Sequence, residues 1–303
     1  MYHGVICVDK PKGMTSHDVV SKVRKILHMK KVGHTGTLDP DVTGVLAVVV
    51  GQATQLTEIL QERQKSYEAV ITLGVSTDTE DASGKVTHTS DVSHITTEMI
   101  DETIENFERE YNQTVPMYSS VKVNGKKLYE YARNGESVTR PNRVVYIHDL
   151  KRTGDINFGE TIDIPITVTC SKGTYIRTLA VDIGRKLGVD AHMSYLRRTE
   201  SCGFTIDDSI ALDDVTSESI IPILDVLDDF YKIELKDELE ARGPFFKTVN
   251  GQKMSQTDMM KLTKNEDVET VLFIKGNRPI GIYKKHKENE YKPFKMFLSS
   301  NDL

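Results

Sequence analysis

The stretch GHTGTLDPDVTGVLAVVV, residues 33–50, joins a polar loop to an apolar strand. Its first part, 33–44, is rich in Gly, Thr, Asp and Pro, which interrupt regular structure. Its last part, 45–50, is an unbroken aliphatic run, typical of a strand that is buried on both faces. The stretch therefore predicts a loop anchored directly to a core strand, a position from which a polar side chain such as Asp39 can reach a ligand.

The flanking sequence alternates between strand and helix patterns without a regular rhythm. The spacing of apolar residues predicts strands at 4–9, 67–73, 144–150 and 162–170, and helices at 17–28, 99–107, 126–134 and 175–187. A doubly wound sheet requires a regular strand-helix-strand order. We therefore expect an α+β fold with a large mixed, mostly antiparallel sheet flanked by helices. Residues 76–93, polar and acidic, are expected to form a long exposed connection.

The chain of 303 residues is long enough for two domains. The acidic stretch 206–240 marks the edge of the first domain and a linker. Beyond it, the residues Lys-Gly-Asn-Arg-Pro at 275–279 separate two apolar runs, as in a β-hairpin. We expect a first domain at 1–235 and a small β-rich domain at 236–303.

Charge is segregated along the chain although the net charge is only -6. Residues 1–38 hold seven Lys or Arg against two acidic residues, and residues 118–152 hold eight against three, so each block carries +5. Residues 206–240 hold two against twelve, a balance of -10. The basic blocks are either a docking surface for a polyanion, if folding brings them to one face, or solvated surface.

Several classes of protein are disfavoured by what the sequence lacks. The longest aliphatic run, 45–50, is far shorter than a membrane span, and residues 1–10 do not resemble an export signal, so we expect a cytoplasmic protein with no membrane partner. The three cysteines are widely spaced, which predicts neither a disulfide framework nor a zinc site. Phosphate-binding, dinucleotide-binding, zinc-protease and esterase signatures are also missing.

The loop at 33–44 and several other segments resemble those of bacterial tRNA pseudouridine-55 synthases, in the same order along the chain. The further matching segments are KPKG at 10–13, KSYEA at 65–69, TDTED at 77–81, PMYSSVK at 116–122, SKGTYIRTL at 171–179 and HMSYLRRT at 192–199. The likeness covers residues 4–204 and becomes weaker after about residue 210. It implies the pseudouridine synthase fold and an isomerase that converts a uridine in the tRNA T-loop, position 55, to pseudouridine.

The resemblance implies three catalytic residues. Asp39 is expected to be the nucleophile, which must be an ionised carboxylate. Arg177 is expected to lie against Asp39, favouring its charged form and orienting it. Tyr67 is expected to stack on the flipped uracil and to assist proton transfer.

Four further residues take binding roles by the same resemblance. His34 is expected to fill the gap left by the flipped uridine, and Lys10 to support the active-site loop or a phosphate. Tyr175 is expected to be a second aromatic partner of the base, and Leu196 an apolar wall that excludes water. Asp78 and Asp81 match an acidic family segment without an assigned role.

Residues 116–143 are expected to form an insertion that grips RNA, since they combine basic side chains, among them Lys122, with several tyrosines. The small domain resembles a shortened RNA-binding, PUA-like module. The expected partner is tRNA, through its T-arm and loop, with no protein partner implied. The reaction moves no electron, hydride or phosphate, so we expect neither a cofactor nor a metal.

Two other functions remain open from the residues alone. A non-catalytic RNA-binding or RNA-folding protein could use the basic faces without chemistry. A carboxylate placed against a ribose also suits a nucleoside glycosidase, which would release free uracil.

Overall fold

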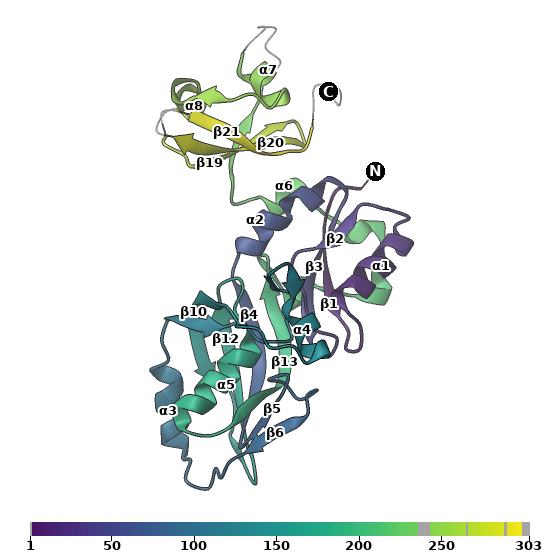
Figure 1. Cartoon of the computed structure of the whole chain (residues 1–303). Coiled ribbons are helices and arrows are strands. Elements are labelled where there is room, and N and C mark those ends of the chain that lie inside the picture. The colour runs from purple at the N-terminus through teal and green to yellow at the C-terminus, as the bar shows by residue number, and fades with distance from the viewer. Residues whose placement is uncertain (1, 236–242, 265, 288–289, 299–303) are drawn as a thin grey trace.

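The computed structural model describes residues 2–235, 243–264, 266–287 and 290–298, and places them in two β-sheet units (Figure 1). The larger unit holds a 12-stranded sheet and the smaller one a five-stranded sheet in the described part of the chain. No helix among the described residues is long and apolar enough to span a membrane.

The main sheet has the short strand β15 at one edge and β7 at the other. Its strands in spatial order are β15 (Ile210–Ala211), β1 (Gly4–Lys10), β3 (Thr43–Val50), β13 (Ala191–Ser201), β4 (Lys65–Leu73), β12 (Ile162–Cys170), β10 (Asn142–Arg152) and β7 (Glu110–Thr114). Four short strands pair alongside them: β2 (Val32–His34), β11 (Asn157–Phe158), β14 (Phe204–Thr205) and β16 (Ile221–Pro222). Strand β1 pairs in parallel with β15, and β13 with β3, whereas the other pairings in this sheet are antiparallel. The predicted mixed, mostly antiparallel sheet is therefore confirmed.

Strand β3 is buried on both faces, which explains its unbroken aliphatic sequence. Leu46, Val48 and Val50 pack into a cluster with helix α1 (Ser16–Ile26). Ala47 and Val49 point to the other face, where they meet α2 (Thr57–Glu62) and α6 (Ile223–Val226). The core strand at the end of the polar loop is thus fixed from both sides.

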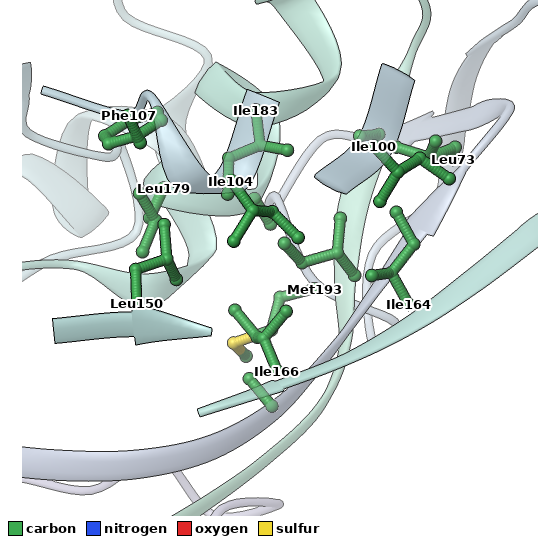
Figure 2. Packing of buried hydrophobic residues seen from close by; sticks show 14 of the residues in the cluster. Leu73, Ile100, Ile104, Phe107, Leu150, Ile164, Ile166, Leu179, Ile183 and Met193 are labelled. Carbon is green, nitrogen blue, oxygen red and sulfur yellow. The ribbon is translucent and has the colours of Figure 1, made fainter. Parts of the chain in front are cut away.

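The other half of the sheet has one covered face. Helices α3 (Thr97–Glu105) and α5 (Ile176–Leu187) pack on β4, β12, β10 and β13, and Figure 2 shows their isoleucines and leucines meeting those of the strands. Strand β12 alternates accordingly, with Ile162, Ile164, Ile166, Val168 and Cys170 buried and the residues between them partly exposed. Helix α5 ends where Gly188 takes a left-handed φ of 77°.

The small domain is built on the order β17-β19-β20-β21-β18. Its strands are β17 (Tyr231–Glu234), β18 (Met254–Ser255), β19 (Thr270–Lys275), β20 (Arg278–Lys287) and β21 (Glu290–Met296), with helices α7 (Pro244–Val249) and α8 (Gln256–Leu262). The predicted hairpin is the β19–β20 pair. The expected boundary at residue 236 lies outside the described residues, but β17 before it already pairs with β19.

The two sheets share one apolar cluster. Leu272 and Ile282 of the small sheet, with Phe297 after it, pack into the same cluster as Val5 of β1 and Ala47 of β3. Gln52 Nε2 also donates a 2.6 Å hydrogen bond to the carbonyl of Phe297. The small domain is therefore packed against the larger one through a shared apolar cluster.

The expectation for residues 76–93 was wrong in part. They include a two-stranded sheet of β5 (Val75–Thr77) and β6 (Val86–Thr89). All four residues of β6 are exposed, so the strand has no buried face that could produce an alternating pattern.

The insertion contains the hairpin β8 (Lys122–Val123) and β9 (Lys126–Lys127), followed by α4 (Leu128–Asn134) as predicted.

Candidate active site

The loop that carries Asp39 is held on both sides of this residue. Before it, the Leu38 N–H donates a 2.8 Å hydrogen bond to Ser16 Oγ, at the start of α1. After it, the Pro40 carbonyl accepts from the Gly13 N–H at 2.8 Å and from Lys10 Nζ at 3.2 Å. Asp39 itself keeps 48% of its side chain exposed. The fold thus fixes the main chain of the loop and leaves the carboxylate accessible.

Three buried cations lie beneath this loop and bind main-chain carbonyls. Lys10, fully buried, donates to the carbonyls of Pro11, Met14 and Pro40, so it supports the loop as expected. Lys65 donates to the carbonyls that end α2, those of Gln61 and Arg63. Arg198, 1% exposed, donates from Nε to Val45 O at 2.7 Å and from Nη2 to Gly36 O at 3.2 Å. We call these three side chains the cationic floor.

The loop that carries Asp39 enters β3 through a contact that requires glycine. Gly44 has a φ of 106° and pairs with Arg198 across the parallel β13–β3 contact. A Cβ atom at residue 44 would lie 2.1 Å from the Arg198 carbonyl oxygen. The close approach of the two backbones brings Arg198 under the loop.

Arg177 lies between two carboxylates. Its Nη2 is 3.4 Å from Asp39 Oδ2, and its Nη1 is 3.2 Å from Asp81 Oδ2. The same guanidinium donates to the carbonyls of Thr79 at 3.3 Å and Tyr118 at 3.0 Å. Only 9% of the Arg177 side chain is exposed. The predicted contact between Arg177 and Asp39 is therefore present, and the orientation of the guanidinium is determined by several acceptors.

Asp81 is held as an ionised partner of Arg177. Burial favours its neutral form, but hydrogen bonds from Ser83 and Thr79, together with the Arg177 charge, lower the pKa of Asp81 below its ordinary value. Thr79 Oγ1 donates to its Oδ1 at 2.7 Å, and Ser83 Oγ does so at 2.6 Å. Asp78 instead closes the turn by accepting from the Lys85 N–H at 2.8 Å.

Tyr67 lies on β4, directly across from Arg198 on β13. It is 7% exposed, and burial raises its pKa to about 12, with the Arg198 guanidinium opposing that rise. The phenol is consequently neutral near pH 7. Arg198 connects this ring to the catalytic loop, since it also binds the Gly36 carbonyl.

His34 ends β2 at the start of the loop and is half-buried. Burial and the nearby Arg198 charge lower its pKa, so its ring is neutral at pH 7. None of the residues that the structure describes forms a hydrogen bond with its buried Nδ1.

The remaining predicted residues differ in how far their side chains are buried. Leu196, on the strand β13 that lies between β3 and β4, packs against two apolar clusters of the main sheet. Tyr175 is half-buried directly before α5, where Gln113 exchanges hydrogen bonds with its N–H and carbonyl. Lys122 is exposed on the β8–β9 hairpin, outside the cluster around Asp39.

Sequence reasoning did not assign roles to Asp81, Arg198 and Lys65. Asp81 ends the acidic segment TDTED, and its place in this matching segment was the signal that could have pointed to a role for its carboxylate. Arg198 and Lys65 lie in matching segments, but a basic residue on a strand is ordinarily exposed. Their burial becomes visible only when the carbonyls that they bind are located.

Two family models match the chain in succession. Residues 24–176 match the TruB family pseudouridylate synthase N-terminal domain, and residues 177–223 match the tRNA pseudouridylate synthase B C-terminal domain. The first match contains Asp39, Tyr67 and Asp81, and the second begins at Arg177.

Curated relatives match over nearly the full length. Proteins named tRNA pseudouridine synthase B from Bacillus pumilus (strain SAFR-032) and Staphylococcus aureus (strain MW2) are 45% and 44% identical to this chain. The alignments cover 98% of this chain in both cases, and 98% and 100% of the respective relatives.

Solved structures show the same fold. The structure titled as an H/ACA RNP bound to a substrate RNA containing 2'-deoxyuridine matches 97% of this chain and 85% of its own, with a TM-score of 0.69 at 24% identity. A Cbf5-Nop10-Gar1 complex matches 99% of this chain and 86% of its own, with a TM-score of 0.68 at 26% identity. The predicted pseudouridine synthase fold is confirmed by these neighbours.

These matches decide between the functions that the residues alone left open, in favour of an isomerase and against a purely RNA-binding protein or a nucleosidase. The first family model covers half of the chain and the relatives cover nearly all of it. The chain belongs to the TruB family of pseudouridylate synthases, which isomerise uridine in tRNA to pseudouridine.

Proposed function

We propose that this enzyme modifies the T-loop uridine at position 55 of tRNA, with Asp39 as the catalytic nucleophile. The observation that carries the proposal is the half-exposed Asp39 carboxylate, 3.4 Å from a guanidinium that three other acceptors orient. An ionised carboxylate fixed in this way can react with a substrate placed above it without first having to be ordered.

The target base must leave the stack of a folded loop before it reaches Asp39. Extrusion of a base costs a few kcal/mol. Stacking on an aromatic side chain such as Tyr67 or Tyr175 returns about 1–3 kcal/mol per base. In this proposal His34, neutral and at the start of the loop that carries Asp39, fills the space that the base leaves. Leu196 supplies an apolar wall that limits access of water to the separated uracil.

The chemistry converts an N-glycosidic bond to a C-glycosidic bond. The uracil is detached from the ribose at nitrogen, turned while it is held in the site, and rejoined through a ring carbon, which loses its proton while the freed nitrogen gains one. Atoms and charge balance within the nucleotide itself, so the reaction requires no electron, hydride or phosphate donor. A cytoplasmic location belongs to the same proposal, because folded tRNA is the substrate.

The insertion, residues 116–143, supplies the grip on the RNA backbone. Lys122 is exposed on its hairpin, and Lys126 and Lys127 lie over the rings of Tyr131 and Tyr129. Phosphates that are neutralised by lysine and arginine make affinity depend on salt. Lys122→Ala should weaken tRNA binding and reduce the slope of log Kd against log salt by about 1.

The experiment is incubation of purified enzyme with an unmodified tRNA transcript and no added cofactor, followed by mapping of pseudouridine. We expect one product, at the T-loop uridine, with no change in mass and no free uracil. A transcript with cytidine at that position should remain unmodified, and Asp39→Asn should lose turnover while it binds tRNA with nearly the same affinity. Modification at other uridines instead, or substantial turnover by Asp39→Asn, would refute the assignment.

A further inference from the structure

Both ends of the insertion are attached to the segments that orient the catalytic carboxylate. Near its start, the Tyr118 carbonyl accepts a 3.0 Å hydrogen bond from Arg177 Nη2. Near its end, Arg140 Nη1 lies 3.0 Å from Glu80 Oε1. Arg177 and Glu80 are both next to groups of the Asp39 site, since Asp81 follows Glu80 in the chain and binds Arg177. The insertion is therefore connected to the catalytic centre at two points.

Glu80 is held in a conformation that its residue type disfavours. Its φ is 65°, in the left-handed region where side chains with a Cβ are uncommon. Its N–H donates to the Thr77 carbonyl at 3.2 Å, and its own carbonyl accepts from the Met193 N–H at 3.1 Å. Such a backbone persists only where surrounding contacts determine it. The hydrogen-bonded main chain thus fixes the direction in which the Glu80 side chain leaves the backbone.

The Glu80 carboxylate uses both of its oxygens in this position. Oε2 accepts a 2.7 Å hydrogen bond from Thr178 Oγ1, on the residue that follows Arg177 in α5, and Oε1 pairs with Arg140. The Glu80 side chain is 16% exposed and that of Arg140 is 35% exposed. One carboxylate therefore joins α5 to the C-terminal end of the insertion, and the low exposure of Glu80 reduces the screening of this pair by water.

We propose that Glu80 is a positioning residue that fixes the C-terminal end of the insertion over the active site. RNA held by the insertion is then presented in register with Asp39 before any chemistry begins. The inference rests on the proposed RNA grip of the insertion, and it adds the device that orients that grip. Loss of the Glu80–Arg140 pair leaves the insertion able to bind phosphates but less well ordered, so the ordering must occur on binding.

The proposal predicts a specific kinetic pattern. Glu80→Gln keeps the size of the side chain and an oxygen for Thr178, but removes the charge that pairs with Arg140. We expect the KM for tRNA to rise about fivefold and kcat at saturating tRNA to stay within about twofold, because bound RNA restores the order of the insertion. The slope of log Kd against log salt should not change, because no phosphate contact is removed.

The test is a double-mutant cycle of Glu80→Gln and Arg140→Gln, with Asp101→Asn as the matched control. Asp101 pairs with Arg152 at 2.7 Å between α3 and β10, away from the insertion, and both side chains are partly exposed, at 36% and 29%. If the pair acts as a unit, the double variant should show the same KM as either single variant, because each change removes the same interaction. Asp101→Asn should leave KM and kcat unchanged.

Each other outcome overturns the inference. Additive effects, together with a salt slope that falls in Arg140→Gln, would mean that Arg140 binds a phosphate directly. A fall in kcat with a lowered melting temperature in Glu80→Gln would mean a purely structural role, and Glu80→Gly, which relieves the left-handed strain, would then restore kcat. Lys122→Ala separates this inference from the proposed function: unchanged binding by that variant refutes the RNA grip itself, whereas weakened binding with an additive cycle refutes only the role of Glu80.

Discussion

Buried cations have different partners below and above the loop that carries Asp39. The cationic floor, Lys10, Lys65 and Arg198, binds main-chain carbonyls, and no ion pair to these three is present in the part of the chain that the structure describes. Above the loop, Arg177 lies between the carboxylates of Asp39 and Asp81. A backbone carbonyl is fixed by the fold and keeps the same hydrogen-bond donor. A side-chain carboxylate can exchange one partner for another. The difference supports the proposal that the floor holds the loop in place, whereas Arg177 acts on the Asp39 carboxylate.

The sharpest test of this difference is Arg177→Lys. A lysine cannot reach two carboxylates and two carbonyls at once, because it lacks the planar fork of the guanidinium. We expect kcat to fall about 10³-fold, equivalent to about 4 kcal/mol, while the melting temperature changes little. Single-turnover rates at saturating tRNA and a thermal melt measure the two quantities.

Arg185→Lys is the control, since Arg185 lies on the same helix with 73% of its side chain exposed. It should retain full activity. A loss of folding stability in Arg177→Lys comparable to its loss of activity would break the comparison, because Arg177 would then be part of the scaffold.

The second prediction concerns the floor. Arg198→Met removes the donors to Val45 O and Gly36 O and leaves both carbonyls buried without these partners. We expect the free energy of unfolding to fall by about 3 kcal/mol, measured by chemical denaturation.

Arg197→Met tests whether position or charge matters. Arg197 is the neighbouring residue, but it pairs with Asp9 at 2.8 Å with 26% of its side chain exposed, so its replacement should cost at most about 1 kcal/mol. Equal losses in the two variants would show that the carbonyl-bound cation is not special.

The smallest predicted effect is a pH dependence of stability that arises at His34. Burial lowers the pKa of His34 in the folded protein, so the unfolded chain binds the proton more readily. Stability from this group is complete above the ordinary value of about 6.5 and decreases as the pH falls below it. Denaturation at pH 7.5 and pH 5.5 should show a smaller difference for His34→Gln than for the unchanged protein.

His94→Gln is the matched control, because His94 is exposed at the end of the β5–β6 region. That variant should keep the full pH dependence. If His34→Gln also keeps it, the ring is not in the dry environment that the floor creates.

Much of the fold could be predicted from the sequence where a pattern reflects burial. The aliphatic run of β3 and the alternation of β12 both follow from how many faces of each strand are covered. Strand β6 could not be predicted in this way, since none of its residues is buried.

In the candidate site, too, some residues could be predicted from the sequence and others could not. Asp39, Tyr67 and Arg177 were identified through a family resemblance, and their proximity depends on contacts between segments far apart in the chain. Of the floor, Lys10 was named through the resemblance, whereas Lys65 and Arg198 were not assigned a role, because they are paired with backbone carbonyls that no side-chain motif records. The conformation of Glu80 was invisible for a similar reason: it depends on hydrogen bonds to Thr77 and Met193.

The apolar cluster shared by the two sheets has a consequence for how the protein can be dissected. Leu272, Ile282 and Phe297 pack into a cluster that also holds residues of α2 and α6, the helices that lie on this side of β1 and β3. A chain truncated before Tyr231 would expose the apolar side chains of this cluster that pack against the small domain, and an exposed apolar surface favours self-association. The small domain therefore shields apolar side chains of the larger domain from water. Removing it should yield a fragment that aggregates rather than a smaller active synthase.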